Sequence, residues 1–195
     1  IIFKKPFPSF GILDANHTFG HYACIRAVDK GILMAKKNGI SAVSVYNSTH
    51  CGSMAYSALH GAKKGYIVLA FTNADSLMLS YNGIKPFFGT NPICVAVPRN
   101  EEEPFCLDMA TTQISWNKLL EYRSKKINFK DKVLADSIGR LTNEVNKATA
   151  LASIGQYKGF GLAAVVEILT GVYSGMNTAD KIPAMFTTPL NKKRK

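Results

Sequence analysis

The stretch from Ile40 to Ser53 constrains the fold of this chain more than any other. It opens with the run Ile40–Tyr46, whose alternating and β-branched residues predict a strand with one buried face. Small polar residues around His50 follow, and Ser53, a residue type suited to a helix N-cap, precedes a helical pattern. We therefore expect His50 on a loop between the carboxyl end of a strand and a helix, where open α/β sheets bind their ligands.

His50 is the first candidate for chemistry, since histidine is the side chain whose ordinary pKa suits proton transfer near neutral pH. A hydrogen-bonded structural histidine would fit the same position. Cys51 is a second candidate, as the nucleophile of a cysteine-dependent enzyme. Adjacent residues rarely direct their side chains at each other, so a pair of Cys51 and His50 is the weaker interpretation.

Apolar periodicity and breaks at glycine and proline predict the remaining elements. Helices are expected at Thr18–Asn38, Ser53–Lys64, Ser115–Lys126, Asn143–Ala152 and Leu162–Ser174, and further strands at Tyr66–Thr72, Ile93–Val97 and Phe105–Leu107. The continuous apolar run Tyr66–Thr72 is typical of a strand in the middle of an α/β sheet, reached by a right-handed parallel crossover. The turn Asn100–Glu103 joins the next two strands as an antiparallel hairpin, so the sheet is expected to be mixed.

The helix expected at Leu162–Ser174 is apolar nearly all round, which indicates burial in the core or at a subunit interface. Glu167 is its one charge. A buried carboxylate needs hydrogen-bond partners, so we expect Glu167 to meet a basic group or to cap backbone N–H groups.

The composition is globular: 47% of the 195 residues are hydrophobic and 19% are charged, which excludes a disordered chain and suits one domain of ordinary size or slightly more. No apolar run is long enough for a transmembrane helix. The four cysteines form no C-x-x-C pair and no zinc spacing with the histidines, which indicates a reducing, cytoplasmic compartment. His17 and His21 are four residues apart, but no third ligand type is near them, so we expect no metal site.

The net charge is +11, and four of the positive charges lie in the tail Lys192–Lys195. Such a tail predicts, as an alternative function, a basic nucleic-acid-binding module. The other basic residues are spread without a stripe of aromatic residues, so nucleic acid is not the expected partner. A basic surface equally suits phosphates and carboxylates of small molecules.

Five motifs taken together resemble one family. In chain order they are Asn47–Gly52, Thr72–Asp75, Gly89–Pro92, Leu107–Thr111 and Gly155–Leu162. Their order and spacing are similar to those of the malate/L-lactate/ureidoglycolate dehydrogenase family, the sulfolactate-dehydrogenase-like oxidoreductases. The helical run Val166–Val172 is similar to the helix that follows the glycine-rich turn in that family. The resemblance extends from about Asp14 to Pro189.

The resemblance implies a three-layer α/β fold around a mixed sheet that binds its nucleotide without a Rossmann motif. The sequence agrees, because no G-x-G-x-x-G follows a strand. It also implies a homodimer that transfers a hydride between NAD or NADP and a small 2-hydroxy acid or 2-oxo acid of the malate, lactate, ureidoglycolate or sulfolactate type. Residues 1–195 would form a single, truncated domain, the central nucleotide-binding and catalytic part of a longer dehydrogenase.

The same resemblance assigns roles to individual residues. It implies that His50 is catalytic and that Asp75 binds substrate. The cofactor-binding residues that it implies are Ala74, Asp108, Met109, Ala110 and Lys158. A lysine suits phosphate or ribose oxygens as a point charge, whereas Asp108 would also serve as a cap at the end of a strand.

Overall fold

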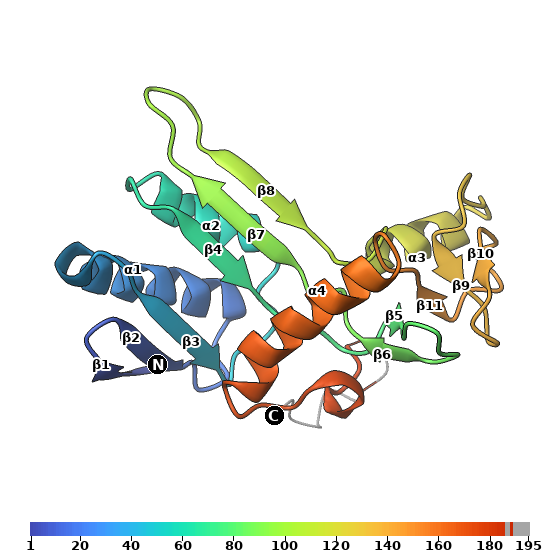
Figure 1. Ribbon diagram of the computed structural model, residues 1–195, viewed down its shortest axis with the longest axis horizontal. Helices are drawn as coiled ribbons and strands as arrows, with labels where there is room; N and C mark the ends of the chain where they lie inside the picture. Colours follow the sequence, from blue (N-terminus) through green and yellow to red (C-terminus); the bar gives the residue numbers. More distant parts are fainter. Residues whose placement is uncertain (186–187, 189–195) are drawn as a thin grey trace. The chain divides into compact units, whose positions relative to one another are not determined.

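The computed structural model describes residues 1–185 and 188, and the chain divides into two compact units (Figure 1). The first unit comprises residues 1–71 and 93–109, and the second comprises residues 72–92 and those from 110 onward. The single domain expected over residues 1–195 stays a prediction.

The first unit contains two helices and two three-stranded sheets (Figure 1). The helices are α1 (Gly20–Asn38) and α2 (Met54–Ala62). The first sheet has the order β1 (Ile2–Phe7), β2 (Phe10–Asp14) and β3 (Ala42–Tyr46). The second has the order β4 (Val68–Phe71), β7 (Ile93–Val97) and β8 (Phe105–Met109). Because β2 pairs with β1 antiparallel and with β3 parallel, the first sheet is mixed, as predicted.

The helices of the first unit bury small side chains. Ala23 and Ala27 of α1 pack with Leu13 of β2, and Val43 and Val45 of β3 cover this cluster. A second cluster joins α2 to the antiparallel sheet and consists of Met54, Ala58, Ala62, Cys94 and Ala96. Small residues at these contacts let the helices lie close to the strands, so the loop between β3 and α2 starts and ends on packed elements.

Most predicted elements of the first unit are confirmed. The strand expected at Ile40–Tyr46 is β3, and the two helices end within two residues of their predicted ends. At the end of α1, Gly39 has a φ of +80° and donates its N–H to the carbonyl oxygen of Ala35. The antiparallel hairpin is β7 and β8, which lie side by side in Figure 1.

The place predicted for the Tyr66–Thr72 strand is wrong. β4 lies at one edge of an antiparallel sheet, and its partner is β7, whereas β3 belongs to the other sheet. All residues of β4 are apolar, but their side chains point alternately to the core and to solvent: Val68 and Ala70 pack toward α2, whereas Leu69 is 59% exposed. A continuous apolar run can therefore form a strand that presents only one face to the core, and the sequence pattern does not distinguish the two cases.

The second unit carries helices of three kinds and one five-stranded sheet. The helices are α3 (Trp116–Ser124), α4 (Tyr157–Glu167), its π-helical continuation η1 (Ile168–Val172) and the 3-10 turn η2 (Ala179–Lys181). The sheet has the order β10 (Leu141–Thr142), β9 (Leu134–Ala135), β11 (Ala150–Leu151), β5 (Met78–Leu79) and β6 (Pro86–Phe88). It is mixed, because β11 runs parallel to β5 and antiparallel to β9.

The helix predicted at Asn143–Ala152 is wrong, because this segment ends in strand β11. Leu151 donates its backbone N–H to the carbonyl oxygen of Leu77, 2.8 Å away, and Leu151 itself is fully buried. Pairing with residues far away in sequence therefore overrides the local preference of the segment.

Two further expectations concern membranes and the basic tail. Among the residues that the structure describes, no helix combines the length and the apolar character that crossing a bilayer requires. The tail Lys192–Lys195 lies outside the described residues.

A charged contact joins α1 to the end of α2. Asp29 of α1 accepts a hydrogen bond from Lys64 at 2.6 Å and contacts Nε2 of His60 at 2.9 Å. The hydrogen bond from Lys64 lowers the pKa of Asp29 below its ordinary value, and the contact with His60 acts in the same direction. The charged form of Asp29 is thus favoured in the folded chain.

We predict that Asp29→Asn lowers the free energy of unfolding at neutral pH by less than about 1 kcal/mol, because the three side chains are partly exposed. The pKa of Asp29 is lower in the folded chain than in the unfolded chain. Its contribution to the free energy of unfolding is therefore fully present above the unfolded pKa, about 4, and is lost as the pH falls from there through the folded pKa. Denaturant unfolding at several pH values measures this difference. Glu101→Gln, at an exposed turn, is the control; an Asp29→Asn effect independent of pH would contradict the prediction.

Candidate active site

The loop that carries His50 lies against the first turn of α1. The N–H of Thr49 donates to the carbonyl oxygen of Thr18 at 3.3 Å, and the N–H of Gly20 donates to Oγ1 of Thr49 at 3.1 Å. A β-carbon on Gly20 would come 2.5 Å from the carbonyl oxygen of His50, so glycine is required at this contact. The start of α1 therefore supports the backbone of the candidate catalytic residue.

The imidazole of His50 is exposed, and a backbone group holds one of its nitrogens. Nδ1 of His50 accepts a hydrogen bond from the N–H of Gly52 at 2.9 Å. Gly52 has a φ of +70°, a conformation that favours glycine. With Nδ1 as an acceptor, the neutral ring carries its proton on Nε2, which is then available to a substrate oxygen.

Asp108 of β8 lies at the other end of this loop. Its Oδ2 accepts hydrogen bonds from Oγ of Ser53 at 2.6 Å and from the N–H of Ala55 at 2.9 Å. Ser53 is the N-cap of α2, as predicted, but the capping oxygen belongs to Asp108. The structure thus brings Asp108 to the helix that follows His50, and its role in cofactor binding stays a prediction.

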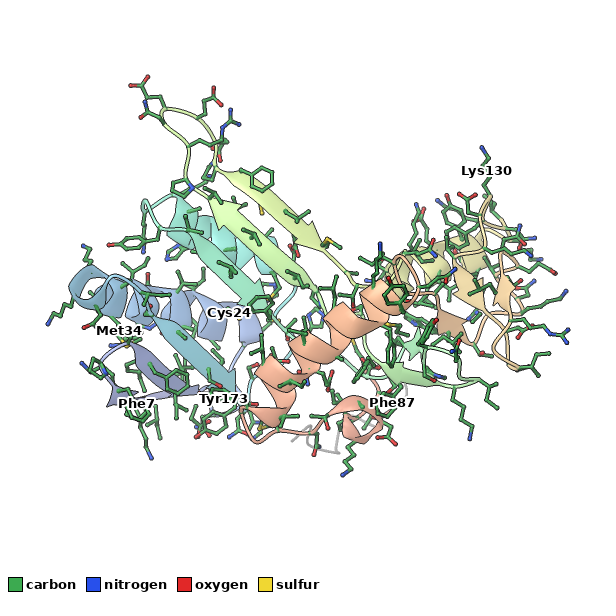
Figure 2. The ribbon with its side chains drawn as sticks, viewed as in Figure 1. Phe7, Cys24, Met34, Phe87, Lys130 and Tyr173 are labelled. Carbon is green, nitrogen blue, oxygen red and sulfur yellow. The ribbon has the colours of Figure 1, made fainter. Side chains whose placement is uncertain are left out.

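Cys51 packs toward the core cluster around α2, and so does Cys24 of α1, which is labelled in Figure 2. The hydrogen bond with Cys51, and then burial, raise the pKa of the Cys24 thiol well above its ordinary value. Burial, and then the neighbouring Cys106, raise the pKa of Cys94 to about 12. Thiols that stay protonated are poor nucleophiles, so core packing accounts for these two cysteines.

In the second unit, the carboxylate of Glu167 is 3% exposed and joins three segments. It accepts hydrogen bonds from Nδ2 of Asn91 at 2.7 Å, from the N–H of Ala179 at 2.8 Å and from Nδ2 of Asn73 at 3.2 Å. The expectation that Glu167 caps backbone is confirmed by Ala179. Among the described residues, the groups that donate to the Glu167 carboxylate are side-chain and backbone amides, and no basic side chain is among them.

Asn91, which is fully buried, extends this network to the predicted substrate turn. Its Oδ1 accepts from the N–H of Ala74 at 3.2 Å, and its Nδ2 also donates to the carbonyl oxygen of Ala163 at 3.0 Å. A β-carbon on Gly89 would collide with the carbonyl group of Ala74. Asp75 follows, half-buried, and its Oδ2 accepts from the N–H of Met185 at 2.9 Å. We refer to these contacts, with those of Glu167, as the Glu167 network.

Lys158 lies in the exposed first turn of α4. Gly155 and Gln156, just before the helix, have φ values of +52° and +56°, which fold the chain sharply into the helix. A helix N-terminus and an exposed ammonium group both favour anions. The residues therefore fit the phosphates of a dinucleotide, and the role of Lys158 stays a prediction.

The predicted site residues fall into two sets. His50, Asp108 and Met109 belong to the first unit, whereas Ala74, Asp75, Ala110 and Lys158 belong to the second. Met109 ends β8 and Ala110 follows it directly, both half-buried. Among the described residues, no group of three or more histidine, cysteine, aspartate or glutamate side chains is placed to hold a metal ion.

Comparison with known proteins decides the family. The family model for malate/L-lactate dehydrogenase matches residues 1–195. The chain belongs to this family. It is 35% identical over 178 residues to the malate dehydrogenase of Pyrococcus abyssi, a match that covers 86% of this chain and 49% of that protein.

A second relative is the ureidoglycolate dehydrogenase (NAD(+)) of Escherichia coli strain K12, 28% identical over 179 residues, with 92% of this chain and 51% of that protein covered. The solved sulfolactate dehydrogenase from Methanocaldococcus jannaschii superimposes with a TM-score of 0.85 at 30% identity, covering 93% of this chain and 54% of that one. The chain therefore spans about half the length of the relatives it matches.

The family confirms two predictions made from the sequence. The α/β class with mixed sheets and the sulfolactate-dehydrogenase-like fold are both correct. The matched relatives are named as dehydrogenases, and nothing in these comparisons supports the nucleic-acid-binding alternative.

We predict that Glu167→Gln destabilises the chain by about 1–3 kcal/mol, because either orientation of the new amide turns an N–H group toward a donor of the Glu167 network. Glu144→Gln is the matched control, since Glu144 is partly exposed and pairs with Lys147 at the surface, and it should cost less than about 1 kcal/mol. Denaturant unfolding measures both changes. Equal unfolding midpoints for the two variants would contradict the prediction.

Proposed function

We propose that the protein carrying this chain is an NAD(P)-dependent 2-hydroxy acid dehydrogenase with His50 as its catalytic residue. The observation that carries the proposal is the exposed imidazole of His50, anchored through Nδ1 by the N–H of Gly52, in a chain of the malate/L-lactate dehydrogenase family. The names of the relatives, malate, ureidoglycolate and sulfolactate dehydrogenase, support a small 2-hydroxy acid or 2-oxo acid as substrate.

The chemistry of the chain's own residues fits a nicotinamide dinucleotide. When bound, this cofactor supplies or accepts the hydride that is exchanged with C2 of the substrate. Lys158 and the N-terminus of α4 would hold phosphate oxygens. The other proposed cofactor-binding residues are Ala74, Asp108, Met109 and Ala110. The proposal covers both NAD and NADP, and the printed name of the Escherichia coli relative specifies NAD(+).

His50 handles the proton. In reduction, Nε2–H of His50 passes its proton to the C2 oxygen of a 2-oxo acid as that oxygen becomes a hydroxyl, and water then returns a proton to Nε2. Oxidation runs through the same steps in reverse: water first takes the Nε2 proton, and Nε2 then accepts the proton of the substrate hydroxyl. As the proton leaves Nε2, negative charge spreads to Nδ1, where the N–H of Gly52 stabilises it. Asp75 keeps Oδ1 for a polar group of the substrate, because the backbone of Met185 already engages Oδ2.

We also propose a cytoplasmic homodimer. The apolar helix formed by α4 and η1 buries Ala163 and Val166, but Val165 is 51% and Val172 62% exposed. Tyr173, beyond η1 and labelled in Figure 2, is 67% exposed. A partner subunit over this face would bury apolar surface that a single chain leaves in water. The cysteines are free thiols in the described chain, which suits a reducing compartment.

We predict that His50→Gln lowers kcat in the complete protein by about 10²–10⁴-fold, since a positioned proton donor contributes this much to catalysis. Nucleotide binding should be kept, because no proposed cofactor contact is changed. The matched control is His17→Gln, an exposed histidine of the same unit. The measurements are steady-state kinetics with pyruvate, oxaloacetate, 2-oxoglutarate and sulfopyruvate as substrates, and a titration with the nucleotide. Turnover within about tenfold of normal in His50→Gln would refute the catalytic role.

A further inference from the structure

His21 lies beside the His50 loop and has no part in the chemistry proposed above. Its ring stacks on Phe19, with centroids 5.0 Å apart and planes at 21°, and meets the ring of Tyr56 edge-on at 5.8 Å. Phe19 precedes α1, and Tyr56 belongs to the first turns of α2. The imidazole of His21 is therefore held from two elements, in front of the loop that joins β3 to α2.

The ring of His21 fills the space beside Gly52. A β-carbon on Gly52 would collide with Nε2 of His21, and Cε1 of the same ring is also within reach of that position. The φ of Gly52 is +70°. Gly52 is thus fixed in two ways: its backbone conformation favours glycine, and the imidazole leaves no room for a side chain.

Hydrogen bonding does not account for His21. Its Nδ1 is buried, and among the described residues no polar atom pairs with it. Buried polar groups are usually hydrogen-bonded, because leaving one unpaired costs free energy. What the ring does provide is its flat face and edge, packed between Phe19, Tyr56 and the backbone of Gly52.

Gly52 is the residue whose N–H donates to Nδ1 of His50. A small rotation of the Gly52 peptide would turn this N–H away and leave the imidazole free to adopt other rotamers and either tautomer. The ring of His21 opposes that rotation, because it lies directly against Gly52.

We propose that His21 is a positioning residue, which fixes Gly52 so that its N–H holds Nδ1 of His50 and presents Nε2–H to the substrate oxygen. The catalytic part of this proposal rests on the proposed function, whereas the tautomer of His50 is a property of the folded chain and needs no turnover. Displacing a catalytic group by about 1 Å costs rates on the order of 10²-fold, so a contact of this kind has a measurable effect.

The test is ¹⁵N NMR of the complete protein labelled at histidine, with the His50 signals assigned from His50→Gln. In the unmodified protein we expect Nδ1 of His50 without a proton and Nε2 with one. In His21→Ala we expect a mixture of the two tautomers and a kcat lowered by about 10–100-fold, with the KM for the nucleotide kept. His21→Phe, which retains a ring against Gly52, should behave as the unmodified protein.

His17→Ala is the matched control, since His17 is exposed and four residues earlier, and it should change neither signal nor rate. The proposal is overturned if His50 carries its proton on Nδ1 in the unmodified protein, a result that requires no variant to fold. It is also overturned if His21→Ala leaves the His50 signals unchanged, whatever happens to kcat. Full turnover in His50→Gln would instead refute the proposed function and leave the NMR result to decide the positioning role.

Discussion

The hydrogen bonds to the buried carboxylate of Glu167 are the interaction on which the arrangement of the second unit depends. Amide and backbone donors from three segments converge on it, and one of them, Asn91, also holds the backbone of Ala74. A carboxylate removed from water is tolerated only when its lone pairs are used, so these segments and α4 must keep one arrangement. Because α4 also carries Lys158, the same network fixes a proposed cofactor residue to the turn that presents Asp75.

In the first unit, contacts that involve the backbone fix the loop that carries His50. The start of α1 supports the His50 loop through Gly20, and Asp108 binds the start of α2 on the other side. Glycine at positions 20 and 52 allows this close approach, since a β-carbon would collide at either place. The exposed imidazole of His50 is thereby attached to a backbone that is held in place, the arrangement that a proton-transfer residue needs.

Local patterns predicted much of the fold and of the site. The β3–loop–α2 order, the β7–β8 hairpin and the ends of α1 follow from alternation, helical periodicity and Gly39. Strand β11 and the edge position of β4 did not, because pairing with distant residues decides both. Glu167 carried a signal, as a lone charge on an apolar helix, but its amide partners lie up to 94 residues away. His21 carried none, since the positioning role that we propose for it depends on its contact with Gly52.

The proposed function requires that the protein exchanges a hydride between a nicotinamide cofactor and a 2-oxo acid. The most direct measurement mixes the complete protein with NADH or NADPH and, one at a time, pyruvate, oxaloacetate, 2-oxoglutarate and sulfopyruvate, and follows the absorbance of the reduced cofactor. We expect the absorbance to fall with at least one of these acids, which identifies substrate and cofactor together. No fall with any acid, in a protein that calorimetry shows to bind neither nucleotide, would contradict it.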